Sequence, residues 1–88
     1  MEKTTVVLNN SDGLHARPAA MFVQEANKYE SDIEIELEEN NVNGKSIIGI
    51  MSLGAFHGEE ITIIAKGKDE KEAIKALEEL INNGFEGV

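Results

Sequence analysis

The chain contains no cysteine, a single proline, and few basic residues for its number of acidic ones. Without cysteine it cannot form disulfides, bind a metal through thiolates or use a cysteine nucleophile. Its longest apolar run, residues 19–23, is far too short to span a bilayer. The N-terminal residues lack the basic region and apolar stretch of a signal peptide, so we expect a cytoplasmic protein.

The charge is strongly negative and unevenly distributed. Eight Lys and Arg residues against seventeen Asp and Glu residues give the 88-residue chain a net charge of −9. This balance makes nucleic acid and anionic membranes poor partners. Residues 13–24 and 40–58 contain no acidic residue, yet they hold Arg17, Lys45 and both histidines. Two regions cleared of negative charge indicate a site for an anionic group.

The apolar pattern predicts a single domain, residues 1–88, with four strands and three helices. The expected order is a strand at 4–8, a helix to about residue 28, strands at 32–38 and around residue 42, a helix at 47–53, a strand at 60–66 and a last helix. Asp69 with Glu72 resembles a capping box that starts this helix, and Gly84 ends it. The order βαββαβα predicts an α+β open-faced β-sandwich, in which three helices cover one face of a four-stranded antiparallel sheet.

The stretch GLHARPAA places His15 close to Arg17 and Pro18. Proline is tolerated in the first turn of a helix, so Pro18 predicts a helix that begins nearby. His15 then lies at a helix N-terminus, where free N–H groups and the helix dipole favour an anion.

Three chemical roles can be compared for His15. As a metal ligand it would have only His57 for company, and we take His57 for an ordinary surface histidine, so no metal site is expected. As a triad base it lacks a nucleophile and an orienting acid nearby. As a phosphate acceptor it has the helix end and Arg17 beside it. On the residues alone, a phosphate acceptor competes with a capping or structural histidine.

The stretch SIIGIMSLG, which begins at Ser46, carries too many apolar residues around a two-turn helix for all of them to reach one core. Ser46 is either a routine N-cap or a phosphorylation site, because a phosphate there would meet the positive helix end and Lys45. Gly44, Lys45 and Ser46 resemble the end of a P-loop, but that motif needs a glycine where Glu39 stands, so we reject it. Together with the outer face of the first helix, this stretch predicts a docking surface that comprises Ala20, Met21, Gln24, Ile47, Ile48 and Met51. The alternatives are an ordinary solvated face on the first helix and a short helix that is simply buried.

GLHARPAA, followed by NGKSIIGIMSLG, resembles HPr, the phosphocarrier of the bacterial phosphoenolpyruvate:sugar phosphotransferase system, and the resemblance covers essentially the whole chain. It implies that His15 takes a phosphoryl group on Nδ1 from phospho-Enzyme I and passes it to a sugar-specific enzyme IIA, while Arg17 steadies the group. It also implies that HPr kinase/phosphorylase modifies Ser46, after which the protein acts as corepressor for the catabolite control protein in carbon catabolite repression.

The resemblance further implies a relay and not an enzyme with its own small-molecule substrate, so no cofactor is expected. One departure is Gly44, which stands where the family often has alanine or a bulkier residue and is expected to loosen the approach to Ser46.

The stretch PAAMFVQEAN is also similar to a regulatory paralogue in the family that lacks the active histidine. A purely regulatory role through Ser46 is therefore the alternative, and a small enzyme with His15 as an acid–base group is a third possibility. The presence of His15 favours the transport role.

Overall fold

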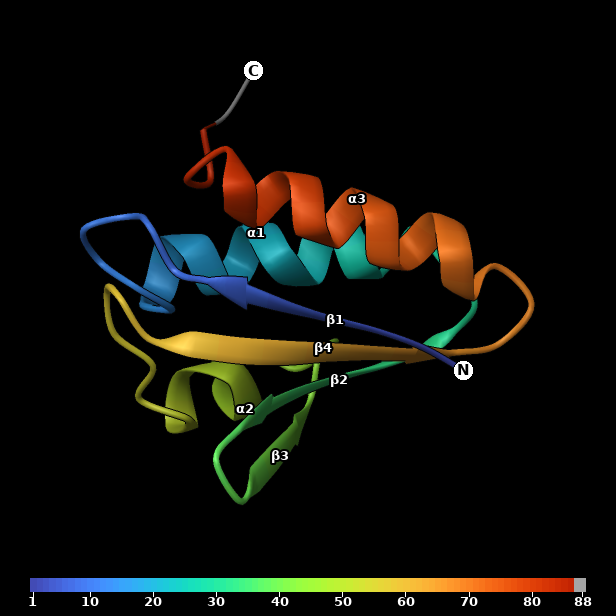
Figure 1. Ribbon diagram of the computed structural model, residues 1–88, viewed down its shortest axis with the longest axis horizontal. Coiled ribbons are helices and arrows are strands. Elements are labelled where there is room, and N and C mark those ends of the chain that lie inside the picture. Colours follow the sequence, from blue (N-terminus) through green and yellow to red (C-terminus); the bar gives the residue numbers. More distant parts are fainter. Residues whose placement is uncertain (87–88) are drawn as a thin grey trace.

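The computed structural model describes residues 1–86 and contains the seven expected elements in the expected order (Figure 1). They are β1 Glu2–Val7, α1 Ala16–Ala26, β2 Asp32–Leu37, β3 Asn40–Asn43, α2 Ile47–Ser52, β4 Glu60–Lys66 and α3 Glu70–Asn82. β1 begins earlier than predicted because its pairing with β4 extends back to Glu2 opposite Ala65. α1 ends at Ala26, before the predicted residue 28, although the Asn27 N–H still donates to the Val23 carbonyl.

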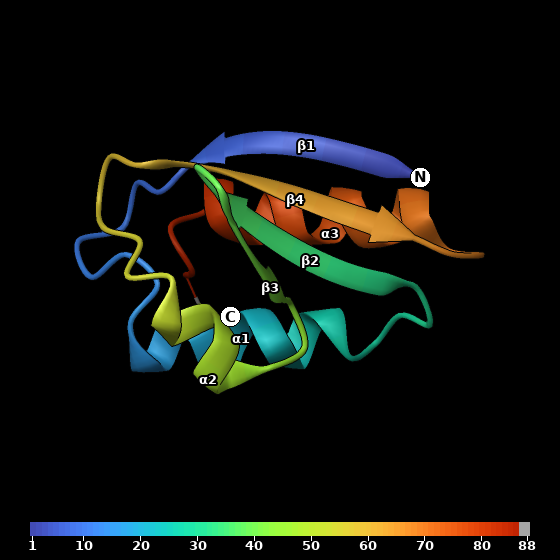
Figure 2. The ribbon, with the colours of Figure 1, turned by 90° about the horizontal axis from the view of Figure 1, so that it is seen from below.

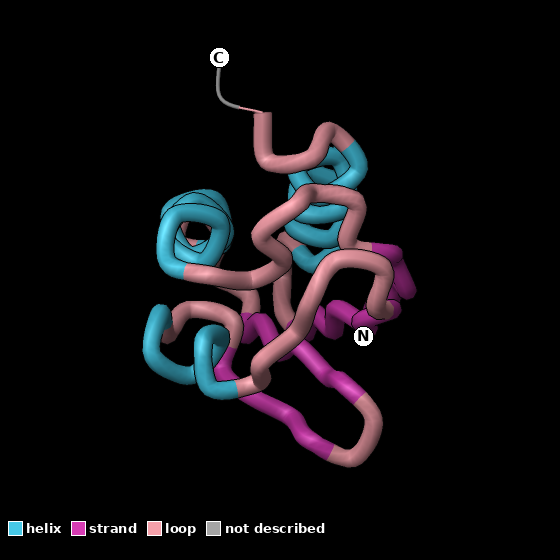
Figure 3. The backbone as a smooth tube through the Cα atoms, turned by 90° about the vertical axis from the view of Figure 1, so that its left-hand side faces the viewer, coloured by secondary structure: helices cyan, strands magenta, loops and turns pink. Residues whose placement is uncertain are grey.

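The four strands form one antiparallel sheet in the order β1-β4-β2-β3. α1 and α3 cover one face of this sheet, while the other face is uncovered (Figures 2 and 3). α2 lies beside α1 and β3. The predicted α+β open-faced sandwich is confirmed. Within residues 1–86, no helix is long and apolar enough to cross a membrane.

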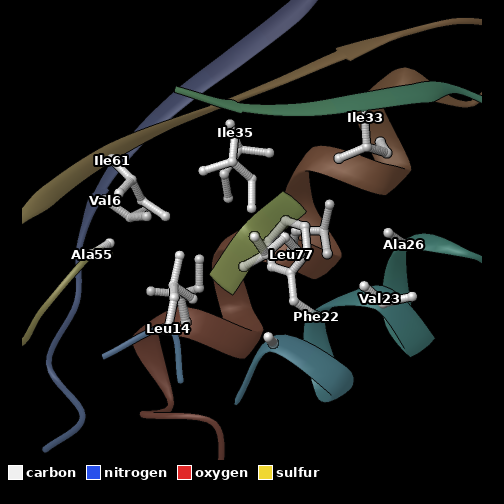
Figure 4. Close-up of a cluster of buried hydrophobic side chains, with 14 of the residues drawn as sticks. Val6, Leu14, Phe22, Val23, Ala26, Ile33, Ile35, Ala55, Ile61 and Leu77 are labelled. Carbon is white, nitrogen blue, oxygen red and sulfur yellow. The ribbon is translucent and has the colours of Figure 1, made fainter. Parts of the chain in front are cut away.

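The core lies between the sheet and the helices, as the period-two pattern of the strands requires. Ile35 of β2 is paired with Ile63 on the neighbouring strand β4, and both side chains are fully buried. Phe22 of α1 is fully buried in the same cluster, on the helix side of Ile35 (Figure 4). Leu14 and Ala55 lie in loops, yet both are buried in the same cluster. Two loops are therefore anchored in the core at the end of the molecule where α1 begins.

The β2–β3 hairpin forms one edge of the sheet. Its turn contains Glu38 and Glu39, and Glu38 has φ 56, in the left-handed region that side chains other than glycine seldom adopt. β3 is only four residues long, with the sequence NNVN. This edge is short, polar and flanked by acids.

The C-terminus of α3 has the geometry that the sequence predicts. Gly84 has φ 68, and its N–H donates to the Ile81 carbonyl at 2.9 Å. The Phe85 N–H donates to the Leu80 carbonyl at 3.0 Å, and the Phe85 side chain is fully buried. These two hydrogen bonds form a Schellman motif, so Gly84 ends the helix as expected.

The capping box predicted from Asp69 and Glu72 is wrong, because the Asp69 side chain makes no capping hydrogen bond. Its carboxylate instead accepts hydrogen bonds from the N–H groups of Glu30 and Ser31, at 2.9 and 3.0 Å, and from the Ser31 hydroxyl. A Cβ on Gly67 would lie 2.7 Å from the Ser31 Cα, so glycine lets the two loops approach this closely. Asp69 thus joins the α1–β2 loop to the β4–α3 loop.

The hydrogen bonds from Ser31 and Glu30 lower the pKa of Asp69. Because the pKa is lower in the folded state, ionised Asp69 stabilises the fold at pH values above the ordinary aspartate pKa of about 4. This contribution is lost as the pH falls through the folded-state pKa. Asp69→Asn should therefore unfold at lower urea concentration than the wild type at pH 7, and the difference should shrink at pH 3. An equal difference at both pH values would show that the Asp69 charge plays no part.

Candidate functional site

His15 is the N-cap residue of α1, with an extended backbone, and its carbonyl accepts the Ala19 N–H at 2.8 Å. The His15 side chain is exposed and makes no capping hydrogen bond. The N–H groups of Ala16 and Arg17 have no acceptor within the helix, and Pro18 has no N–H. The imidazole therefore lies in solvent at the positive end of an eleven-residue helix, as Pro18 predicts.

The turn before His15 is braced by an asparagine that the sequence did not single out. The Asn10 side-chain amide donates to the Gly13 carbonyl at 2.8 Å, and the Gly13 N–H donates back to the Asn10 carbonyl at 3.3 Å. Within residues 1–86, the buried Oδ1 of Asn10 has no hydrogen-bond partner, so the bond to Gly13 sets the orientation of the amide. The Asn9 side chain donates to the Asn82 carbonyl, which ties the turn to α3.

Gly13 brings this turn against the loop between α2 and β4 (Figures 1 and 2). Its φ is +60, and a Cβ at this position would lie 2.5 Å from the Ala55 carbonyl oxygen and 2.8 Å from the Phe56 Cα. The next N–H, of Leu14, donates to that same Ala55 oxygen at 3.0 Å. Only glycine fits both the backbone conformation and the contact.

A shallow depression of about 110 Å³ results beside His15, with Asp12, Met51 and Phe56 among its lining residues. Sequence analysis missed Phe56, whose side chain is 69% exposed. The available signal was an aromatic residue within the acid-free stretch 40–58, next to a histidine. His57, as expected, is exposed.

The residues of the predicted docking surface lie on α1 and α2, which contact each other. Ile48 is 82% exposed, whereas Ile50 in the same short helix is fully buried, so α2 divides its apolar residues between solvent and core. The other predicted members are exposed or half-buried: Ala20, Met21, Gln24, Ile47 and Met51. The predicted exposure is confirmed, and docking by these residues stays a prediction.

Arg17 is exposed on α1, and its Nη1 donates to Met21 Sδ at 3.1 Å. Its guanidinium thus rests one turn further along the helix and not on His15. Neither ion pair found in residues 1–86 involves Arg17. The same residues contain no cluster of three His, Asp or Glu side chains that could hold a metal ion.

Ser46 is the N-cap of α2, because its Oγ accepts the Gly49 N–H at 3.0 Å. Lys45 was expected to lie beside Ser46, but its ammonium donates to the Tyr29 carbonyl at 2.7 Å, beyond the end of α1. The long Lys45 side chain can reach a carbonyl group near the end of α1, a contact that the order of residues along the chain does not reveal.

Gly44 does not loosen the approach to Ser46 as expected. It is buried, and its N–H donates to the Ile33 carbonyl at 2.7 Å. A Cβ on Gly44 would lie 2.6 Å from the Ile33 side chain. Glycine therefore allows the backbone to pack closely against Ile33.

The chain is similar in sequence and structure to proteins of one family. A family model described as the PTS HPr component phosphorylation site matches residues 2–83. The HPr-like protein Crh of Bacillus subtilis (strain 168) is 49% identical over 77 residues, which are 88% of this chain and 91% of that protein. HPr-C-His from Thermoanaerobacter tengcongensis has a TM-score of 0.94 at 49% identity, with 100% of each chain covered. The phosphocarrier protein HPr from Bacillus anthracis str. Ames has a TM-score of 0.87 at 48% identity, over 91% of this chain and 95% of that one.

The close contact at Gly13 can be separated from its backbone conformation by comparison with Gly54, which has φ +64 but no atom within 4 Å of the position that a Cβ would take. Gly54→Ala should cost about 1–2 kcal/mol for the left-handed conformation alone, or roughly 4–8 °C in Tm per kcal/mol. Gly13→Ala should cost more than Gly54→Ala, because the Cβ also meets the Ala55 oxygen. Equal melting temperatures for the two variants would contradict the contact.

Proposed function

Because the chain belongs to the HPr family of phosphocarrier proteins, we propose that it relays a phosphoryl group from phospho-Enzyme I through His15 to sugar-specific enzyme IIA domains in sugar uptake. Members of this family are carriers and not enzymes. The observation that carries the proposal is the exposed, uncapped imidazole of His15 at the positive end of α1. Catalysis of another reaction by His15 would need partners such as a nucleophile or a metal, and residues 1–86 contain no cluster that could hold a metal ion.

In the proposed step, a lone pair on Nδ1 of neutral His15 attacks phosphorus while the bond from phosphorus to the donor histidine of Enzyme I breaks. The phosphoryl oxygens then face the N–H groups of Ala16 and Arg17 at the helix end, where each dipole contact contributes about 0.3–1 kcal/mol. The Arg17 guanidinium adds charge-assisted hydrogen bonds once it leaves Met21. Transfer to enzyme IIA uses the same exchange of bonds, so the relay consumes no cofactor.

The proposed partners bind the surface around His15. This surface combines the exposed apolar residues of α2 with the outer face of α1 and, newly, Phe56. Residues 13–24 and 40–58, which supply most of this surface, contain no acidic residue, although Asp12 lies at its border. This low negative charge suits partners that themselves carry a phosphohistidine. We place this relay in the cytoplasm, without membrane insertion or direct contact with nucleic acid, in keeping with the net charge of −9.

We further propose that Ser46 is the regulatory phosphorylation site for HPr kinase/phosphorylase, and that the modified protein binds the catabolite control protein. Ser46 is half-buried next to the exposed Ile47 and Ile48, so a phosphate there would add negative charge within the docking surface. A phosphate at this N-cap is compatible with α2, because it meets the positive end of the helix. In the unmodified protein the Lys45 ammonium donates to the Tyr29 carbonyl.

A purely regulatory role is the second candidate, and the 49% identity to the HPr-like protein Crh favours it. In that case Ser46 would be modified, but His15 would receive no phosphate from Enzyme I. The two roles therefore differ in one measurable property, the phosphorylation of His15 by Enzyme I.

Incubation with Enzyme I and phosphoenolpyruvate should add one acid-labile phosphate, detected as a mass increase. His15→Ala should abolish this increase while the melting temperature stays close to the wild type, because an exposed N-cap imidazole buries little surface. His57→Ala, which removes the other exposed histidine, should be labelled normally. Labelling of His15→Ala would refute the carrier role, and unlabelled wild type would favour the regulatory one.

Ser46→Asp should slow phosphoryl transfer to His15 by up to about fivefold at low salt, since an exposed charge pair is worth about 0.2–1 kcal/mol. The effect should weaken as salt screens the added charge. Ser46→Asn is the matched control, because asparagine also caps helices but adds no charge. If Ser46→Asn slowed transfer as much as Ser46→Asp, the charge would not be the cause.

A further inference from the structure

Arg17 is the single arginine of the chain, and its resting contact is a methionine sulfur. Residues 17 and 21 are one turn apart on α1 and share a face. Helical side chains lean toward the N-terminus, so the Met21 thioether covers the turn that Arg17 occupies. Met21 is half-buried and packs against the core, whereas Arg17 is exposed. The sulfur is thus the fixed partner in this contact and the guanidinium is the mobile one.

The hydrogen bond from Arg17 to the Met21 sulfur is weak, so little free energy is needed to move the guanidinium to another acceptor. A thioether is a weak hydrogen-bond acceptor, whereas charged oxygens bind a guanidinium strongly and often in pairs. Residues 13–24 contain no Asp or Glu, and the two ion pairs found in residues 1–86 do not include Arg17. The guanidinium therefore has a defined resting place without a strong competitor for a phosphoryl group.

We propose that Met21 is a positioning residue that holds Arg17 beside α1 while His15 is unmodified and releases it when a phosphoryl group arrives. This inference rests on the proposed phosphoryl transfer to His15. The contact between Arg17 and Met21 exists only in the unmodified state, so its strength lowers the equilibrium constant for phosphorylation of His15 by the same factor. A stronger acceptor at position 21 would hold the protein in the unmodified state, and a non-acceptor would favour the phosphorylated one.

Two substitutions of similar volume change the acceptor alone. Met21→Leu removes it and Met21→Gln replaces the sulfur by an amide oxygen, which is a better acceptor. With Enzyme I and phosphoenolpyruvate plus pyruvate as the probe, the equilibrium constant for His15 phosphorylation should fall about two- to fivefold in Met21→Gln. It should rise up to about twofold in Met21→Leu, because the contact that favours the unmodified state is lost. Melting temperatures of both variants establish that they are folded under the assay conditions.

The double-mutant cycle with Arg17→Ala separates positioning from packing or docking. If Met21 acts through Arg17, the difference between Met21→Gln and Met21→Leu should disappear in the Arg17→Ala background. A difference of the same size in that background would overturn the inference, because Met21 would then act by another route.

A second measurement needs no phosphate. Nitrogen-15 relaxation of the Arg17 Nε–H in the unmodified protein should report a more ordered side chain in the wild type than in Met21→Leu. Equal mobility in the two proteins would also overturn the inference. Failure of Enzyme I to phosphorylate the wild type would instead refute the proposed function, and the relaxation data would still decide whether Met21 holds Arg17.

Discussion

The site depends on one close approach between two backbones, that of Gly13 to Ala55 and Phe56. It allows the Leu14 N–H to reach the Ala55 carbonyl, and it turns both neighbouring side chains, Leu14 and Ala55, into the core. Because Leu14 directly precedes His15, the core and the α2–β4 loop together hold the first turn of α1 in its place in the molecule. The position of the His15 imidazole thus depends on the packing of Leu14 and Ala55 in the core.

Strong and weak interactions are divided between the frame of the molecule and its working surface. The frame is held by the carboxylate of Asp69 between two loops and by the amide of Asn10 across a turn. On the surface, His15 makes no capping bond, Arg17 rests on a sulfur, and Ile48 faces water. The exposed groups around His15 are thereby held only weakly, on a scaffold that stronger hydrogen bonds keep in place.

The sequence predicted those features that depend on neighbours along the chain. The order of the seven elements, the start of α1 two residues before Pro18, the N-cap at Ser46 and the helix end at Gly84 all follow from residues within about one turn. The division of α2 into exposed and buried faces could also be anticipated, because the helix is too short to bury every apolar side chain.

The features that the sequence did not predict arise from contacts between distant segments. Aspartate is a residue type that often caps helices. The Asp69 carboxylate instead accepts hydrogen bonds from Ser31, 38 positions away, because Gly67 lets the two loops approach each other. Lys45 reaches the Tyr29 carbonyl for the same kind of reason. Phe56 could not be assigned to the site without knowing that its loop lies against the turn before His15. Local patterns carry no information on which loops touch.

The edge formed by β3 has a consequence for the behaviour of the protein at high concentration. An open sheet edge is a template on which a second chain can add a strand, and repetition of that addition leads to aggregates. Here the edge offers four residues, and Glu38 and Glu39 precede them in the turn. Two such edges brought together would form only a very short ladder, flanked by acidic turns. The chain can therefore expose apolar side chains on α2 while its β3 edge resists the addition of further strands.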